Sequence, residues 1–108
     1  MKNINISFSD SDIKAVSCAL SVLPSYSFFD SFPPQLISLP QNIILKLHQK
    51  QKLDDQAFYL IAVSVDAAYK AMRDEITVEA DAVAELRPHF FSINKLFPLL
   101  SPLLDSGK

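Results

Sequence analysis

Glycine and cysteine are almost absent from this chain of 108 residues. Its one glycine, Gly107, lies beside the last residue, so neither common glycine-rich phosphate-binding loop can form. Its one cysteine, Cys18, excludes an internal disulfide and a zinc site built from several cysteines. These absences remove two familiar kinds of nucleotide and metal site.

A strong excess of positive charge is also missing. Ten Lys and Arg residues stand against twelve Asp and Glu, a formal net charge of -2, whereas non-specific nucleic-acid binding relies on a basic excess. The longest apolar run, residues 57–63, is far shorter than the roughly 20 residues that cross a bilayer, and residues 3–8 lack the apolar core of a signal peptide. We therefore expect a cytoplasmic protein that binds neither nucleic acid nor membrane, and a free thiol fits that reducing compartment.

Apolar residues make up 49% of the chain and charged residues 20%, a composition typical of a folded protein. The length suits one domain over residues 1–108. Charge is uneven along it, because residues 1–53 hold five bases and three acids while residues 54–108 hold five bases and nine acids. The acidic segment 74–85 is typical of the solvated side of a helix, and the alternative is a surface that attracts a basic partner.

Helical signals dominate the pattern. The spacing of Ser9 and Asp12 predicts a capping box that opens a helix ending at Pro24, and Ser38 with Gln41 predicts a second box. Asp54 is expected to cap the strongest helix, residues 55–75, whose apolar residues form two stripes and place it centrally.

A shorter segment completes the predicted helical part. Thr77 is expected to cap a helix from Val78 to about Leu86, which Pro88 stops. We therefore predict an all-α bundle of four or five helices around the central helix 55–75. Residues 3–8 alternate polar and apolar like a strand, so the bundle carries a short extended N-terminal segment, and the alternative is an α+β fold with a small sheet that includes residues 3–8.

Apolar residues gather in two places with weak helical signals. In the proline-rich segment 24–40, aromatic residues either fold over the core as a lid or form an exposed anchor for a partner. The tail 97–104 is apolar but interrupted by Pro98 and Pro102, so it is expected to pack on the core, on another subunit or on a partner. The candidate partner-binding residues in these segments are Tyr26, Phe28, Phe29, Phe32, Phe97, Leu99, Leu100, Leu103 and Leu104.

This apolar surplus predicts a non-catalytic module that binds another protein or self-associates, with a homo-oligomer as the expected form. One alternative is a small-ligand binder or enzyme with a pocket between helices, lined by Tyr59, Tyr69 and the phenylalanines. A second is a helix-turn-helix DNA-binding protein with its turn at residues 62–64.

No residues stand out as catalytic, cofactor-binding or metal-binding. Cys18 is expected to be a small buried thiol, and His48 has no ligand partner in the sequence. Asp81, Glu85 and His89 are spaced by four, which predicts an exposed polar ridge in preference to a metal site.

Overall fold

Six α-helices and three short 3-10 segments make up residues 8–105, the part of the chain that the computed structural model describes. No strand occurs among these residues, so the all-α prediction is confirmed. Four of the helices have ten residues or more, within the predicted four or five. In chain order the α-helices are α1 (Asp10–Val22), α2 (Pro34–Ile37), α3 (Leu39–His48), α4 (Asp55–Met72), α5 (Ala80–Leu86) and α6 (Phe90–Asp105).

The predicted extended segment of residues 3–8 lies outside the described residues except for Phe8. Phe8 has no regular secondary structure, and its ring stacks on that of Phe58 in α4 with the centroids 6.3 Å apart. The alternative α+β fold finds no support, because a sheet including residues 3–8 has no partner strand among residues 8–105.

Helix α1 begins at the predicted capping box. The backbone N–H of Asp12 donates to Ser9 Oγ at 3.2 Å, and the backbone N–H of Ser9 donates to Asp12 Oδ2 at 3.1 Å. Two N–H groups that a helix start leaves without partners are satisfied in this way. The helix ends at Val22, and the 3-10 segment Leu23–Ser25 carries the chain through Pro24, as expected.

The second predicted capping box is wrong. Helix α3 does begin at Leu39, but the Ser38 side chain accepts no hydrogen bond from the first turn. Ser38 has φ -89° and ψ -9°, a helical conformation, because it continues directly from the single turn of α2. An N-cap side chain reaches back to the helix only from an extended backbone, so α2 prevents the box.

Helix α4 begins as predicted, with Asp54 Oδ1 accepting a hydrogen bond of 2.8 Å from the N–H of Ala57. Ten of its residues are buried, among them five alanines that let neighbouring helices approach closely. The two long helices α4 and α6 run in opposite directions, since Tyr69 stacks on Phe97 while Met72, later in α4, and Phe90, earlier in α6, line the same hollow. The central position that we expected for this helix stays a prediction.

Helix α5 begins later than predicted. It starts at Ala80 and not at Val78, and the backbone carbonyl of Glu79 accepts the first helical hydrogen bonds. Thr77 and Val78 instead belong to the non-helical connection from α4, in which Val78 packs against the core. The contact of the partly buried Val78 with the core thus takes precedence over the capping preference of Thr77.

Helix α6 runs through both prolines of the tail, which we expected to break it. A proline inside a helix costs about 3 kcal/mol because it removes a backbone donor and crowds the preceding turn. Here Pro98 and Pro102 are exposed, while Leu96 and Leu100 on the opposite side are almost fully buried. The buried side of α6 offsets the cost of the two prolines.

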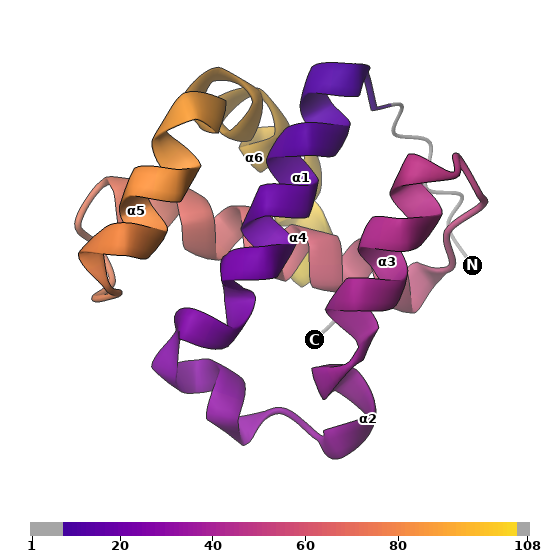
Figure 1. Ribbon diagram of the computed structural model, residues 1–108, viewed down its shortest axis with the longest axis horizontal. Helices are drawn as coiled ribbons and strands as arrows, with labels where there is room; N and C mark the ends of the chain where they lie inside the picture. The colour runs from indigo at the N-terminus through magenta and orange to yellow at the C-terminus, as the bar shows by residue number, and fades with distance from the viewer. Residues whose placement is uncertain (1–7, 106–108) are drawn as a thin grey trace.

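Figure 1 shows α1 and α3 crossing in front of α4, with α5 beside α1 at the far side from α3. One hydrophobic cluster joins side chains from α1, α3, α4, α5 and α6. The molecule measures 36 × 29 × 25 Å along its principal axes. Among residues 8–105, no helix combines the length and hydropathy that a membrane span requires.

Two helices end on residues with a left-handed backbone, the conformation that usually selects glycine. Lys50 after α3 has φ 56° and Asp74 after α4 has φ 59°. At both ends the next N–H returns to a carbonyl in the last turn, from Gln51 to Lys46 at 2.9 Å and from Glu75 to Lys70 at 2.8 Å. Hydrogen bonding thus holds two non-glycine residues in a strained conformation.

Replacing Asp74 by glycine should therefore stabilise the protein. We expect Asp74→Gly to raise the free energy of unfolding by about 0.5–1 kcal/mol, because glycine adopts a positive φ without steric cost. Urea unfolding followed by circular dichroism measures the change. Asp74→Ala is the control, since it keeps the Cβ atom; an equal gain from both variants would assign the effect to the lost charge.

Candidate functional site

The aromatic residues of segment 24–40 fold over the core. Tyr26 is 2% exposed and Phe29 is 7% exposed, while Phe32 is half-buried with its ring centroid 5.0 Å from that of Phe29. Burial raises the pKa of the Tyr26 phenol, so it stays neutral. The structure thus places these three candidates as a lid, and the side chain of Phe28 lies outside the described part of the chain.

Most candidates in the tail are turned inward as well. Leu100 is 1% exposed, and Leu103 and Leu104 are partly buried against the core. Phe97 stacks on Tyr69 with the ring centroids 4.0 Å apart and the planes 13° from parallel. Leu99 is the exception, because 54% of its surface is exposed.

The exposed side of α6 forms an apolar stripe. Phe91 is 87% exposed, the largest value among the exposed large apolar residues of the described chain. Lys95 lies one turn further on and is the charged residue of the stripe, and Pro98, Leu99 and Pro102, two and three turns from Phe91, are also exposed. We call Phe91, Lys95, Pro98, Leu99 and Pro102 the α6 outer face.

A hollow of about 450 Å³ adjoins the start of this face. Its walls come from the end of α4, from the 3-10 segment Arg87–His89 and from the start of α6. Phe90, 46% exposed, lines it together with Phe91. The remaining lining residues are Met72, Arg87 and Pro88. Apolar surface therefore continues from the α6 outer face into a depression with one cation at its edge.

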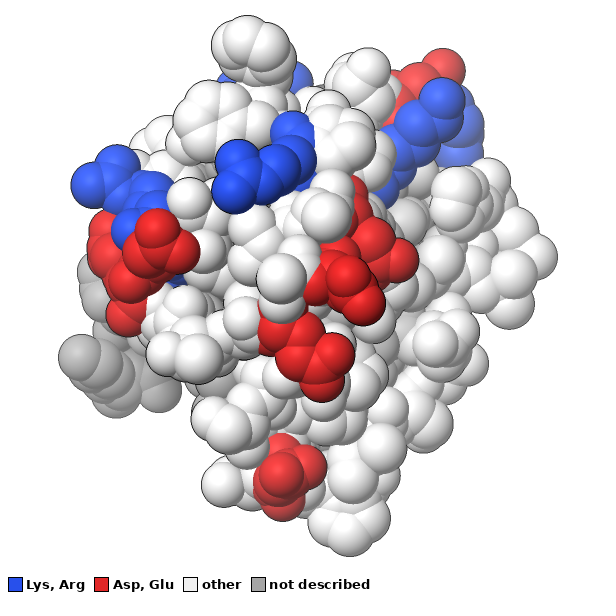
Figure 2. Space-filling view, turned by 60° about the vertical axis from the view of Figure 1, so that its left-hand side comes forward, with Lys and Arg blue, Asp and Glu red and all other residues white. Residues whose placement is uncertain are grey.

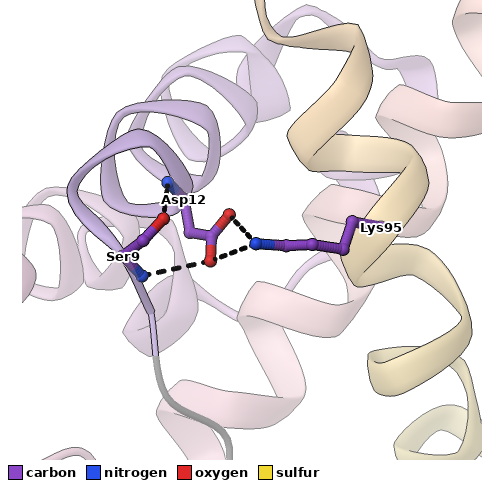
Figure 3. Close-up of polar contacts among 3 residues, drawn as sticks. All are labelled: Ser9, Asp12 and Lys95. Carbon is purple, nitrogen blue, oxygen red and sulfur yellow. Dashed lines mark hydrogen bonds and ion pairs between the residues drawn. The ribbon is translucent and has the colours of Figure 1, made fainter.

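Lys95 is held in place by the first turn of α1 (Figure 3). Its Nζ atom lies 2.8 Å from Asp12 Oδ1 and donates a hydrogen bond of 2.9 Å to Oδ2. The Asp12 side chain is 3% exposed and that of Lys95 is 57% exposed. The same carboxylate accepts the backbone N–H of Ser9, so one buried group joins the capping box of α1 to the middle of α6.

These contacts set the pKa of Asp12. Burial alone raises the pKa of the carboxyl, but the hydrogen bonds from Lys95 and Ser9 and the charge of Lys95 outweigh it, and the net pKa lies below the ordinary value of 3.8. The carboxylate is therefore charged at neutral pH. A buried charge with good partners is costly to disturb, because the cationic partner is left behind.

The surroundings of Cys18 disfavour a reactive thiolate. Burial, followed by the nearby charge of Glu85, raises the pKa of the Cys18 thiol, which donates to the backbone carbonyl of Glu85 at 3.3 Å. A neutral thiol is a poor nucleophile. Ser17 Oγ lies 3.4 Å from His48 Nε2, a long-range contact between α1 and α3 that the sequence pattern did not indicate.

Acidic side chains spread over the surface beside α5. Asp81 and Glu85 are exposed and His89 is half-buried. Figure 2 turns this side forward and shows red Asp and Glu groups across it, with blue Lys and Arg groups above. Within residues 8–105, no group of three or more His, Cys, Asp or Glu side chains is placed to hold a metal ion.

The structure also bears on two alternatives from the sequence. Residues 62–64 lie inside the continuous helix α4, which leaves no turn for a helix-turn-helix at that point. Of the side chains expected to line a ligand pocket, Phe90 and Phe91 line the hollow beside α6, whereas Tyr59 is 46% exposed and Tyr69 stacks on Phe97. Comparison of the chain with models of known protein families, with curated proteins and with solved structures gave no match.

The sequence pattern contained a signal for the α6 outer face. Once residues 90–105 are taken as one helix, positions 91, 95, 98, 99 and 102 fall on one side at helical spacing, and the buried positions 93, 96 and 100 fall on the other. The two prolines concealed this periodicity, because they suggested that no helix spans the tail.

The low pKa of Asp12 predicts a pH-dependent contribution to stability. A carboxyl whose pKa falls on folding stabilises the protein above its unfolded pKa, and the contribution is lost as the pH falls through the folded pKa. Asp12→Asn should therefore lower the free energy of unfolding by about 2 kcal/mol at pH 7, and the difference from the wild type should shrink below about pH 4.

Urea unfolding of both proteins between pH 2.5 and pH 7 measures this difference. Asp81→Asn, which removes an exposed carboxylate from α5, is the matched control and should change stability by less than about 0.5 kcal/mol. A difference between wild type and Asp12→Asn that is the same at every pH would contradict a role for the charge.

Proposed function

We propose that this chain is a non-catalytic interaction module that forms a homo-oligomer through the α6 outer face. The observation that carries the proposal is the exposure of Phe91, at 87%, within an apolar stripe along a helix. Moving a side chain of this type from water into a contact stabilises the associated state by about 1.5–3 kcal/mol. Leu99, a candidate from the sequence, belongs to the same stripe.

The charge of the α6 outer face supports a second copy of the chain as the occupant. A two-fold interface brings each patch against itself, so a lone charge in the patch meets a like charge. Lys95 is the charged residue of this face, and it already has Asp12 as its partner within the same chain. Two copies can therefore meet with reduced repulsion between their lysines.

The size of the face supports weak association. Helix α6 has sixteen residues, which corresponds to a length of about 24 Å. A helix face of this length with the adjoining hollow offers less than the roughly 800 Å² per partner of a standard stable interface. We expect a dissociation constant between about 10 µM and 1 mM, and we keep a cytoplasmic location as part of the proposal because Cys18 is a free thiol.

Replacing Phe91 tests the proposal directly. Sedimentation velocity at rising protein concentration should show a dimer for the wild type, and Phe91→Ser should weaken association at least about tenfold, since the largest exposed apolar side chain of the face is gone. Leu45→Ser is the matched control: Leu45 is 56% exposed but lies on α3, and its loss should leave association unchanged.

Two results would overturn the proposal. The first is a wild-type protein that stays monomeric up to millimolar concentration. The second is association that Leu45→Ser weakens as much as Phe91→Ser does. Circular dichroism of each variant establishes that the fold is intact.

A further inference from the structure

A second hollow, of about 340 Å³, lies between the first turns of α1, the end of α3 and the start of α4. It shares no lining residue with the hollow beside α6. Five apolar side chains form its floor, and three polar ones border it. The floor consists of Phe8, Ile13, Leu47, Leu53 and Phe58, and the border of Lys50, Gln51 and Lys52.

The backbone explains why lysines stand at this border. Helix α3 ends on Lys50 in its left-handed conformation, where the N–H of Lys50 returns to Leu47 and that of Gln51 to Lys46. The short connection that follows reaches Asp54, the cap of α4. Glycine would satisfy the backbone at position 50 at lower cost, but only a residue with a long side chain puts a cation beside the apolar floor.

The floor is apolar and well packed underneath. Leu47 is 4% exposed and Phe58 is 9% exposed, and the Phe58 ring is covered from one side by that of Phe8. Ile13 and Leu53 are half-buried and complete the surface. The floor has no polar side chain that could hydrogen-bond to a ligand, so the polar group of a ligand must lie at the border.

Positive charge dominates the border. Lys50 forms an ion pair with Asp10, whose Oδ1 lies 3.7 Å from Lys50 Nζ, and both side chains are more than 70% exposed. An exposed pair at this distance contributes little and exchanges readily with another anion. A smaller neighbouring hollow of about 260 Å³, lined by Asp10, Ile13, Lys14, His48 and Lys50, adds one more lysine beside the same border.

We propose that this hollow binds the carboxylate of a single-chain amphiphile such as a medium-chain fatty acid. The alkyl chain lies on the five apolar side chains, and the carboxylate lies between the ammonium groups of Lys50 and Lys52. A volume of about 340 Å³ is at the small end of ligand sites, which span roughly 300–1,000 Å³, and it favours one narrow chain over a bulky ring system.

Titration of the full chain, labelled with nitrogen-15, with sodium decanoate tests the assignment. Amide shifts should move first at Lys50–Leu53 and at Ile13, and saturate at decanoate concentrations below micelle formation. Butyrate has the same head and too short a chain, and decanol has the same chain and no charge. Each should bind at least about tenfold more weakly, because each lacks one of the two interactions.

The double variant Lys50→Gln with Lys52→Gln removes the cations and leaves slightly shorter, uncharged polar side chains. It should weaken decanoate binding at least about tenfold, which corresponds to 1.4 kcal/mol. Lys70→Gln on α4 is the matched control, because Lys70 pairs with Asp66 and lines neither hollow. It should change the affinity by less than about twofold.

Three outcomes would overturn the proposal: shifts that cluster on α6 instead of around Lys50, equal binding of decanol and decanoate, or an unchanged affinity in the double variant. Phe91→Ser should bind decanoate like the wild type. The result therefore separates this site from the self-association proposed for the α6 outer face, and either proposal can fail alone.

Discussion

The buried carboxylate of Asp12 is the contact on which the arrangement of α1 and α6 depends. Its oxygens receive the backbone N–H of Ser9 and the ammonium group of Lys95 (Figure 3). The first contact belongs to the local start of α1, and the second joins residues 83 positions apart in the chain. Phe91 lies one turn before Lys95 on the same side of α6, so the group that completes a helix cap also orients the most exposed aromatic side chain.

The fold was predictable where local chemistry decides it. The caps at Ser9 and Asp54, the end of α1 before Pro24 and the end of α5 at Leu86 all follow from short-range patterns, and the structure has them. The predictions at Ser38 and Thr77 were wrong because neighbouring segments decide those backbones: a helical turn precedes Ser38, and Val78, partly buried against the core, follows Thr77. At both positions the neighbouring segment outweighed the capping preference.

The candidate site was predictable only in part. Composition drew attention to the tail, where Leu99 is exposed, but Tyr26, Phe29 and Leu100 are buried. The number of apolar residues does not tell which of them a core of this size encloses, since that depends on the path of α6. The positions of the lysines in the sequence also did not indicate a binding site, because the hollow at Lys50 forms only where α1, the end of α3 and α4 meet.

The prolines of α6 also determine how a surface that packs on this helix must treat its backbone carbonyls. Pro98 and Pro102 have no N–H to offer the backbone carbonyls four residues earlier, at Asn94 and Pro98. A carbonyl oxygen that lacks its helical donor accepts a hydrogen bond from water or from another donor. A purely apolar surface packed on α6 would remove this water without supplying another donor, at a cost of about 1–3 kcal/mol for each oxygen. Water retained between two copies of this face would avoid the loss, so the proposed self-association leaves these two carbonyls hydrated.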